Sequence, residues 1–326
     1  MAGENLPSLI AGSRIAEQSG AGIELPVLIA NAGNAARFAY EEFLLGRMRN
    51  KHTRRAYERA ARRFFAWCEG RRELTAITPA DVGRYLDELE LADTSKKLHL
   101  SALRHLFDEF VVRHVVVLNP ATSVRGPRIS VVEGLTPEIT VQQARALLAS
   151  LKTTTALELR DRAVIGTLIY TAARVGAIAK LRRKDFYHDG EQHNVRFREK
   201  GGKSREIPVR HDLAGYFQKY VETLSEADEA SPLFLTGEGK TGRLTANGAS
   251  EDDLARMVKR RMRQAGLPKR LSAHSFRVAT ITDLLDQGVP LEDVQHLAGH
   301  ADPRTTRLYD RRKRRIKRNI VERISI

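Results

Sequence analysis

The stretch LAGHADPRTTRLY, residues 297–309, places His300 nine residues before Tyr309. Upstream, the sequence HSFR (274–277) opens a helical pattern and brings a histidine and an arginine to one helix face, three residues apart. Two further stretches are rich in basic side chains: TAARVGAIAKL (171–181), at the end of an apolar helix, and EKGGKSR (199–205), in a predicted β-hairpin. The second half of the chain therefore gathers arginine, lysine, histidine and tyrosine in an ordered series.

Each of these side chains has a plain structural alternative when it is taken alone. An arginine is most often a surface salt-bridge partner, a hairpin lysine is usually solvated, and a single histidine is more often a cap or a core residue. Most tyrosines are packing residues. The histidines lack the HExxH and Cys/His spacings of zinc sites, so the sequence predicts no metal site. Only the joint pattern favours a catalytic site.

The region around these stretches has the pattern of an α+β domain, for which we set the bounds 138–326. The sequence TVQQ, starting at Thr140, fits a helix capping box. Helical periods cover residues 140–150, 158–173, 211–224, 250–265 and 274–287. The segments 195–198 and 205–209 flank Gly201-Gly202 and predict the β-hairpin.

The first half of the chain predicts a small helical bundle over residues 36–118. One helix carries an apolar stripe at helical spacing and an arginine stripe opposite it. The apolar stripe consists of Tyr57, Ala61, Phe64, Phe65 and Cys68, and the basic stripe of Arg55, Arg59, Arg62 and Arg63. Residues 1–35 lack a sustained period and are interpreted as a flexible leader. Residues 119–137, broken by prolines and glycines, are interpreted as a linker.

Composition indicates the class of partner. The chain has 326 residues and 42% hydrophobic residues, which suits two folded domains. Its formal net charge is +15, which suits a nucleic acid as partner more than a membrane, and the basic residues are clustered along the chain. On composition alone, a generally basic protein such as a ribosomal one is an equal alternative. The sequence contains no apolar run long enough for a membrane span, no secretory signal pattern, and a single cysteine, Cys68. We therefore expect an intracellular protein without membrane association.

Over residues 36–315 the chain resembles a tyrosine recombinase of the phage integrase family, in its short two-domain form. The family pattern is an arginine after a helix, a lysine on a β-hairpin, His-x-x-Arg, then Gly-His, with a tyrosine nine residues later. It is matched in order by Arg174, Lys200, His274, Arg277, His300 and Tyr309. The resemblance implies a mainly α fold with a small β-sheet, in which a helical core-binding (SAM-like) DNA-binding domain precedes an α+β catalytic domain.

The resemblance also implies a role for each matching residue. Tyr309 would attack the scissile phosphate, and His274 would take or relay its proton. Arg174, Arg277 and His300 would neutralise the phosphate oxygens in place of a metal ion. Lys200 would protonate the leaving 5′-oxygen. The energy of the broken bond stays in the phosphotyrosine, so no cofactor is expected.

The expected partner is double-stranded DNA with inverted-repeat sites, bound by a homotetramer on two sites that exchanges strands through a Holliday junction. The candidate DNA contacts, chiefly to phosphates, are Arg54, Arg55, Lys97, Arg104 and Lys203. The segment 311–326 would form a helix that docks on a neighbour, or that folds back on its own domain. The resemblance places the protein in the cytoplasm, on the nucleoid of a prokaryote or encoded by a mobile element.

Two departures from the family pattern concern positions beside the arginines. Family members often have an acidic residue where this chain has Ala177, and a histidine where it has Val278. These departures put fine positioning in question more than activity. The alternatives are a type IB topoisomerase-like nicking-closing enzyme, which shares the active-site logic, and a non-catalytic DNA-binding protein of the same fold.

Overall fold

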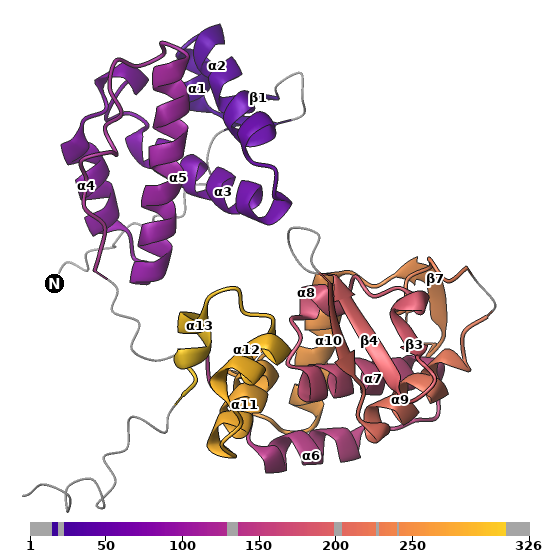
Figure 1. Ribbon diagram of the computed structural model, residues 1–326. Helices are drawn as coiled ribbons and strands as arrows, with labels where there is room; N and C mark the ends of the chain where they lie inside the picture. The colour runs from indigo at the N-terminus through magenta and orange to yellow at the C-terminus, as the bar shows by residue number, and fades with distance from the viewer. Residues whose placement is uncertain are drawn as a thin grey trace, which may run out of the picture. The chain divides into compact units, whose positions relative to one another are not determined.

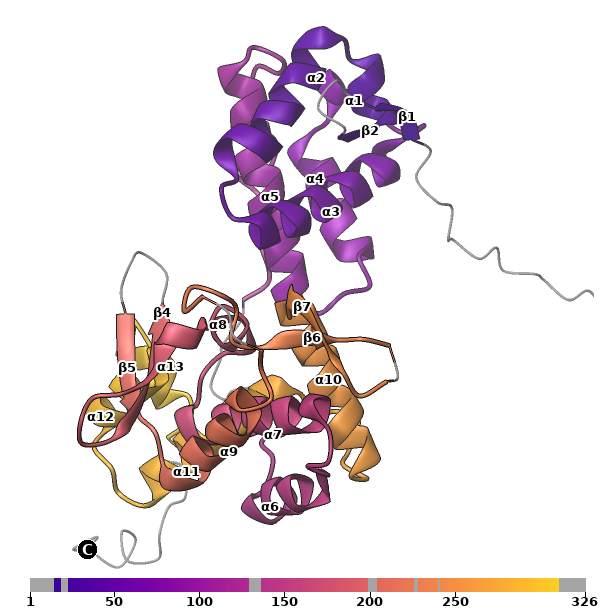
Figure 2. The ribbon, with the colours of Figure 1, turned by 90° about the vertical axis from the view of Figure 1, so that its right-hand side faces the viewer.

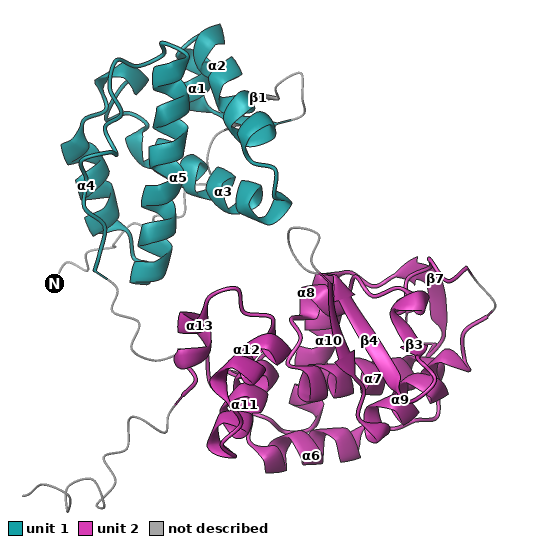
Figure 3. Ribbon diagram, in the orientation of Figure 1, with its two compact units in different colours: residues 1–130 teal, residues 131–326 magenta. Residues whose placement is uncertain are grey.

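The computed structural model of the chain describes residues 15–18, 23–128, 136–198, 204–225, 228–239 and 241–310. Contacts divide the chain into two compact units, residues 1–130 and 131–326 (Figure 3). Helices dominate, and the strands form only small antiparallel sheets (Figure 1). This confirms the predicted fold class. Within the described ranges, no helix is both long enough and apolar enough to cross a membrane.

Unit 1 is a helical bundle preceded by two short paired strands. Its strands are β1 (Ile15–Gln18) and β2 (Glu24–Pro26). Its helices are α1 (Val27–Asn31), α2 (Asn34–Glu41), a π-helical segment (Glu42–Arg47), α3 (Lys51–Cys68), a 3-10 turn (Leu74–Ala76), α4 (Pro79–Glu88) and α5 (Asp93–Val112).

Local sequence explains where the longer helices of unit 1 begin. The Asn50 side chain accepts hydrogen bonds from the backbone N–H groups of His52 and Thr53, so it caps α3. Thr78 and Asp81 form a reciprocal capping box at the start of α4, where Pro79 occupies the first helical position.

The core of unit 1 is built on the predicted apolar stripe of α3. Phe64 and Phe65 are buried, and the Phe64 ring meets Tyr85 of α4 edge-on, with 5.0 Å between ring centroids. Phe107 and Phe110 of α5 complete the cluster, and α5 packs across α3 (Figure 1).

Part of the segment that we interpreted as a flexible leader belongs to this core. Residues 24–31 form β2 and α1, and Leu25 and Ile29 are 2% and 0% exposed. The side chain of Arg62 donates to the carboxylate of Glu24 and so holds β2 against α3. The leader interpretation is therefore wrong for residues 15–18, which pair with β2, and from residue 23 onward. A few buried side chains in short elements escape a test that requires a sustained period. Residues 1–14 and 19–22 lie outside the described residues.

The first part of the predicted linker is also packed. Ala121 is fully buried, and the Arg104 guanidinium donates to the carbonyl oxygens of Ala121 and Val124, at 3.1 and 2.6 Å. The Asn119 side chain bonds back to α5. Residues 119–124 thus extend unit 1, since Arg104 of α5 binds the carbonyl oxygens of Ala121 and Val124. Residues 129–135 lie outside the described residues.

Unit 2 combines a three-stranded antiparallel sheet with helices. Its strands are β3 (Phe186–His188), β4 (His193–Arg198), β5 (Ser204–Pro208), β6 (Leu235–Gly237) and β7 (Leu244–Gly248). Its helices are α6 (Val141–Ser150), α7 (Ala156–Thr171), α8 (Val175–Ile178), a 3-10 turn (Arg183–Asp185), α9 (His211–Val221), α10 (Glu251–Gln264), α11 (Ala273–Asp286), α12 (Leu291–Ala298) and α13 (Pro303–Arg307).

Helix α7 lies at the centre of unit 2 (Figure 2). Its middle is buried on all sides, and it packs against α9, α10 and α11. Gly166 allows the close approach of α9, because a Cβ atom there would lie 2.8 Å from the Tyr216 ring. The Thr140 capping box and the hairpin of β4 and β5, both predicted from sequence, are confirmed.

Candidate active site

Five of the six residues matched to the family pattern lie in the described part of unit 2, at the ends of helices. Arg174 precedes α8, His274 and Arg277 stand in the first turns of α11, His300 follows α12, and Tyr309 follows α13. Helices α11, α12 and α13 group at one side of the unit (Figure 1). Lys200 and Lys203 fall in residues 199–203, outside the described residues.

A tight turn after α7 links Arg174 to α11. Helix α7 ends at Thr171, and the next residue, Ala172, caps it with a left-handed backbone, with φ of 50°. The carbonyl oxygen of Ala172 accepts a hydrogen bond from Nη1 of Arg277, at 2.5 Å. Arg277 is 1% exposed, whereas the Arg174 side chain is exposed. One arginine is therefore locked into the protein and the other is free to reach outward.

The turn at the end of helix α12 positions His300 in the candidate site. Gly299 adopts the left-handed conformation, with φ of 64°, which ends the helix and turns the chain. The backbone N–H of His300 then donates to Gln295 at 3.1 Å, and the Gln295 side chain donates to the His300 carbonyl at 3.0 Å. The His300 side chain is 6% exposed, and its Nδ1 lies 2.9 Å from the Thr306 hydroxyl.

Tyr309 lies between the two histidines. Its ring stacks on that of His300, with 5.9 Å between centroids and 9° between planes. Its hydroxyl oxygen lies 3.4 Å from Nε2 of His274. Val278 and Ile281 of α11 complete a small apolar cluster around the tyrosine, which is 8% exposed. Val278, where the family often has a histidine, thus packs beside the tyrosine.

The electrostatics of the site come from cations around two imidazoles. Burial, followed by the charges of Arg277 and Arg174, lowers the pKa of His300 to about 3. Desolvation and the same two arginines lower the pKa of His274. Both rings are therefore neutral near neutral pH, and a neutral His274 Nε2 can accept the tyrosine proton. The arginines provide positive charge suited to a phosphate.

Two further residues join the site that the sequence analysis did not assign. Arg205 on β5 is buried, donates to the carbonyl of Leu297 at the end of α12, and contributes to lowering the His300 pKa. Thr306 is fully buried and bonds to His300. The sequence shows that Arg205 lies in the hairpin and that Thr306 lies between His300 and Tyr309. Neither position predicts the contact with Leu297 or with His300.

The proposed DNA-contacting residues of unit 1 divide into two kinds. Arg54 donates to the Met48 carbonyl at 3.0 and 3.2 Å, and Arg104 holds residues 121–124, so both guanidiniums already have backbone partners. Arg55 and Lys97 are exposed. The structure thus gives Arg54 and Arg104 a role within the fold, although Arg104 is exposed like Arg55 and Lys97.

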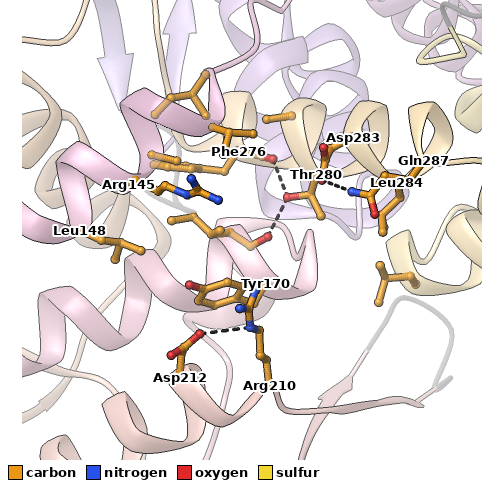
Figure 4. A pocket seen from close by; sticks show the side chains of 16 residues that line it. Arg145, Leu148, Tyr170, Arg210, Asp212, Phe276, Thr280, Asp283, Leu284 and Gln287 are labelled. Atoms are coloured by element: carbon orange, nitrogen blue, oxygen red, sulfur yellow. Dashed lines mark hydrogen bonds and ion pairs between the residues drawn. The ribbon is translucent and has the colours of Figure 1, made fainter.

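A pocket of about 730 Å³ lies on a different face of α11 (Figure 4). Phe276, Thr280 and Asp283 of α11 line the pocket. They follow one another at helical spacing on one face of the helix, whereas Arg277, Val278 and Ile281 lie on another face. The Arg210 guanidinium lies over the ring of Tyr170 at the other wall of the pocket. Within the described ranges, no group of three or more His, Cys, Asp or Glu side chains could hold a metal ion.

Comparisons with known proteins show the family of the chain. Residues 137–315 match the model of the Phage integrase family, and residues 39–114 match the phage integrase N-terminal SAM-like domain. Tyrosine recombinase XerC 2 of Ralstonia nicotianae is 30% identical over 293 residues, which cover 83% of this chain and 80% of that protein. Tyrosine recombinase XerC of Pelobacter propionicus is 28% identical over 265 residues, covering 79% and 84%.

Among solved structures, the fold is similar to that of the XerH site-specific recombinase bound to a palindromic difH substrate, in a post-cleavage complex. The TM-score is 0.65 and the sequence identity 20%, and the match covers 80% of this chain and 77% of that one.

Proposed function

This chain belongs to the phage integrase family and is a tyrosine-type site-specific DNA recombinase, and we propose that Tyr309 is the nucleophile with which it cuts and rejoins DNA. The observation that carries the proposal is the Tyr309 hydroxyl 3.4 Å from Nε2 of His274, beside Arg277 and Arg174. A nucleophile, a neutral base and two cations meet at one place.

In the cleavage step, the Tyr309 oxygen bonds to the scissile phosphorus and the bond from phosphorus to the 5′-oxygen breaks. His274 accepts the phenolic proton at Nε2. The ring is neutral beforehand because burial, and after it the charges of Arg277 and Arg174, lower its pKa. Lys200 donates a proton to the leaving 5′-oxygen. The product is a 3′-phosphotyrosine and a free 5′-hydroxyl, and attack by a 5′-hydroxyl of the partner strand reverses the chemistry.

The cations act on the charge that develops on the phosphate oxygens. Arg277 is held by its bond to the Ala172 carbonyl, so it needs little reorganisation during the reaction. Arg174 is exposed and can close on the second non-bridging oxygen. His300, neutral and buried, can offer an N–H donor. These groups supply the stabilisation that other nucleases obtain from a divalent ion.

The same proposal extends to assembly. Strand exchange between two sites with inverted repeats calls for four protomers, and we propose a homotetramer whose segment 311–326 docks on a neighbour. Ile316, Ile320, Val321 and Ile324 give that segment an apolar stripe. The segment lies outside the described residues, and the alternative is that it folds back on its own unit.

The test separates the nucleophile from the acid. Tyr309→Phe removes one oxygen and almost no volume, so it should retain site binding and lose the covalent adduct on a nicked suicide substrate. Lys200→Ala should form the adduct slowly, because the 5′-oxygen leaves unprotonated. A substrate with sulfur at that bridging position needs little acid help, so it should rescue Lys200→Ala and not Tyr309→Phe.

Each alternative has its own outcome in this test. An adduct formed by Tyr309→Phe would disprove the assignment of the nucleophile. Failure of sulfur to rescue Lys200→Ala would point to Lys203 as the acid. A wild-type protein that binds its site without any adduct would be a non-catalytic DNA-binding protein, and relaxation of supercoiled DNA lacking a second site would indicate a topoisomerase-like enzyme.

A further inference from the structure

Thr306 is the fully buried residue of α13, a helix otherwise formed by exposed and half-buried residues. Its hydroxyl oxygen lies 2.9 Å from Nδ1 of His300. Threonines inside a helix commonly bond to the carbonyl one turn earlier, as Thr167 and Thr171 of α7 do, at 2.7 and 2.6 Å. The Thr306 hydroxyl instead lies against the His300 imidazole, whose Nδ1 can accept its proton.

The direction of this hydrogen bond follows from counting protons. A neutral imidazole carries one N–H, on Nδ1 or on Nε2. If Nδ1 carried it and donated to Thr306, the hydroxyl proton would have no acceptor among the described residues. A buried hydroxyl without an acceptor is unfavourable, because its lost bond to water is not replaced. If the hydroxyl donates to Nδ1, both groups are satisfied, and the imidazole proton resides on Nε2.

We propose that Thr306 is a positioning residue that donates its hydroxyl proton to Nδ1 of His300 and so fixes the tautomer in which Nε2–H faces the scissile phosphate. The phosphate as target rests on the proposed function, whereas the tautomer does not. With the proton on Nε2, His300 is a donor to an anionic oxygen. With the proton on Nδ1 instead, Nε2 would present a lone pair to that oxygen and repel it.

The backbone of Thr306 links this histidine to the nucleophile. Its carbonyl oxygen accepts the N–H of Tyr309 at 3.0 Å, and the Tyr309 ring stacks on His300. Asp302 caps the start of α13 by accepting from the N–H of Arg304 at 2.8 Å. One short helix thus fixes the imidazole through a side chain and the tyrosine through a main chain.

Two variants of Thr306 separate the hydroxyl from the shape of the residue. Thr306→Val keeps the branched shape and removes the hydroxyl, and Thr306→Ser keeps the hydroxyl. Thr305→Val is the matched control, because Thr305 is its half-buried neighbour on the same helix and has no bond to His300. All three are made in the full chain, and circular dichroism reports whether each folds.

The tautomer is read directly, without DNA, by nitrogen-15 NMR of histidine-labelled protein, with the His300 signals identified from their loss in His300→Gln. Wild type, Thr306→Ser and Thr305→Val should show the proton on Nε2, and Thr306→Val should show a mixture of tautomers. A proton on Nδ1 of the wild-type ring would overturn the proposal whatever the protein does to DNA.

The catalytic consequence is read from single-turnover cleavage. Thr306→Val should slow adduct formation about 10-fold. This is less than the roughly 10²–10³-fold loss expected when a donor to the phosphate is removed outright. Thr306→Ser should restore the wild-type rate. In a His300→Gln background the valine substitution should add little, since it acts through the histidine. An equal loss in both backgrounds would overturn the positioning role. A wild-type protein without an adduct would refute the proposed function and leave the tautomer result standing.

Discussion

Acidification should destabilise unit 2 through His300. The folded protein lowers the pKa of this ring to about 3 from the ordinary value of 6.5. Between these values the unfolded ring binds a proton that the folded ring excludes, so protons favour unfolding there. The contribution of His300 to stability is therefore complete above pH 6.5 and is lost progressively as the pH falls toward 3.

The size of the effect follows from the same two values. Each pH unit in this window is worth about 1.4 kcal/mol per proton. Going from about pH 7.5 to about pH 5 covers roughly 1.5 units below the unfolded pKa, which gives a loss of about 2 kcal/mol. His274, whose pKa is also lowered, changes stability in the same direction. A comparison of variants isolates the part due to His300.

The assay is urea unfolding at both pH values, for the wild type and for His300→Gln, whose side chain does not titrate. Far-UV circular dichroism follows both units, whereas the fluorescence of Trp67, the single tryptophan, follows unit 1. The wild type should lose about 2 kcal/mol more than His300→Gln, in the transition that Trp67 does not report. His211→Gln is the control: this side chain is 82% exposed, so the variant should lose as much stability between the two pH values as the wild type. An equal loss in the wild type and His300→Gln would refute the claim that burial among cations keeps this ring neutral.

Three more predictions concern the rest of the chain. The log of the DNA-binding constant should fall against log salt with a slope of several units, at about 0.9 per neutralised phosphate, and a slope near zero would contradict phosphate-dominated binding. Ile29→Ala should lower the free energy of unfolding of unit 1 by about 2–5 kcal/mol in urea titrations, because its side chain is fully buried, whereas Val117→Ala, 90% exposed, should change it little. Removing residues 311–326 should leave binding to a half-site intact and reduce the cooperative filling of a full site in gel-shift titrations; unchanged cooperativity would favour a tail that folds back.

The periodic segments were predictable from sequence because their information is local. The stripe of Phe64 and Phe65, the capping box at Thr140 and the hairpin of β4 and β5 each depend on residues a few positions apart. Residues 23–35 were misassigned for the same reason. Their buried side chains, among them Leu25 and Ile29, show no helical or strand period and can be recognised as core residues only in the packed unit.

The sequence by itself determined the fold class and the order and spacing of the site residues, because helical period and motif spacing are properties of neighbouring positions. Only the tertiary structure decided which atoms meet. The bond from Arg277 to Ala172 spans 105 positions, and the contact of Tyr309 with His274 spans 35. The turn of Thr306 toward His300 and the lowered pKa of that ring likewise depend on burial and on charges brought in by other segments. Hydrogen bonding and desolvation act through space over a few ångströms, so they follow the path of the folded chain and cannot be read along it.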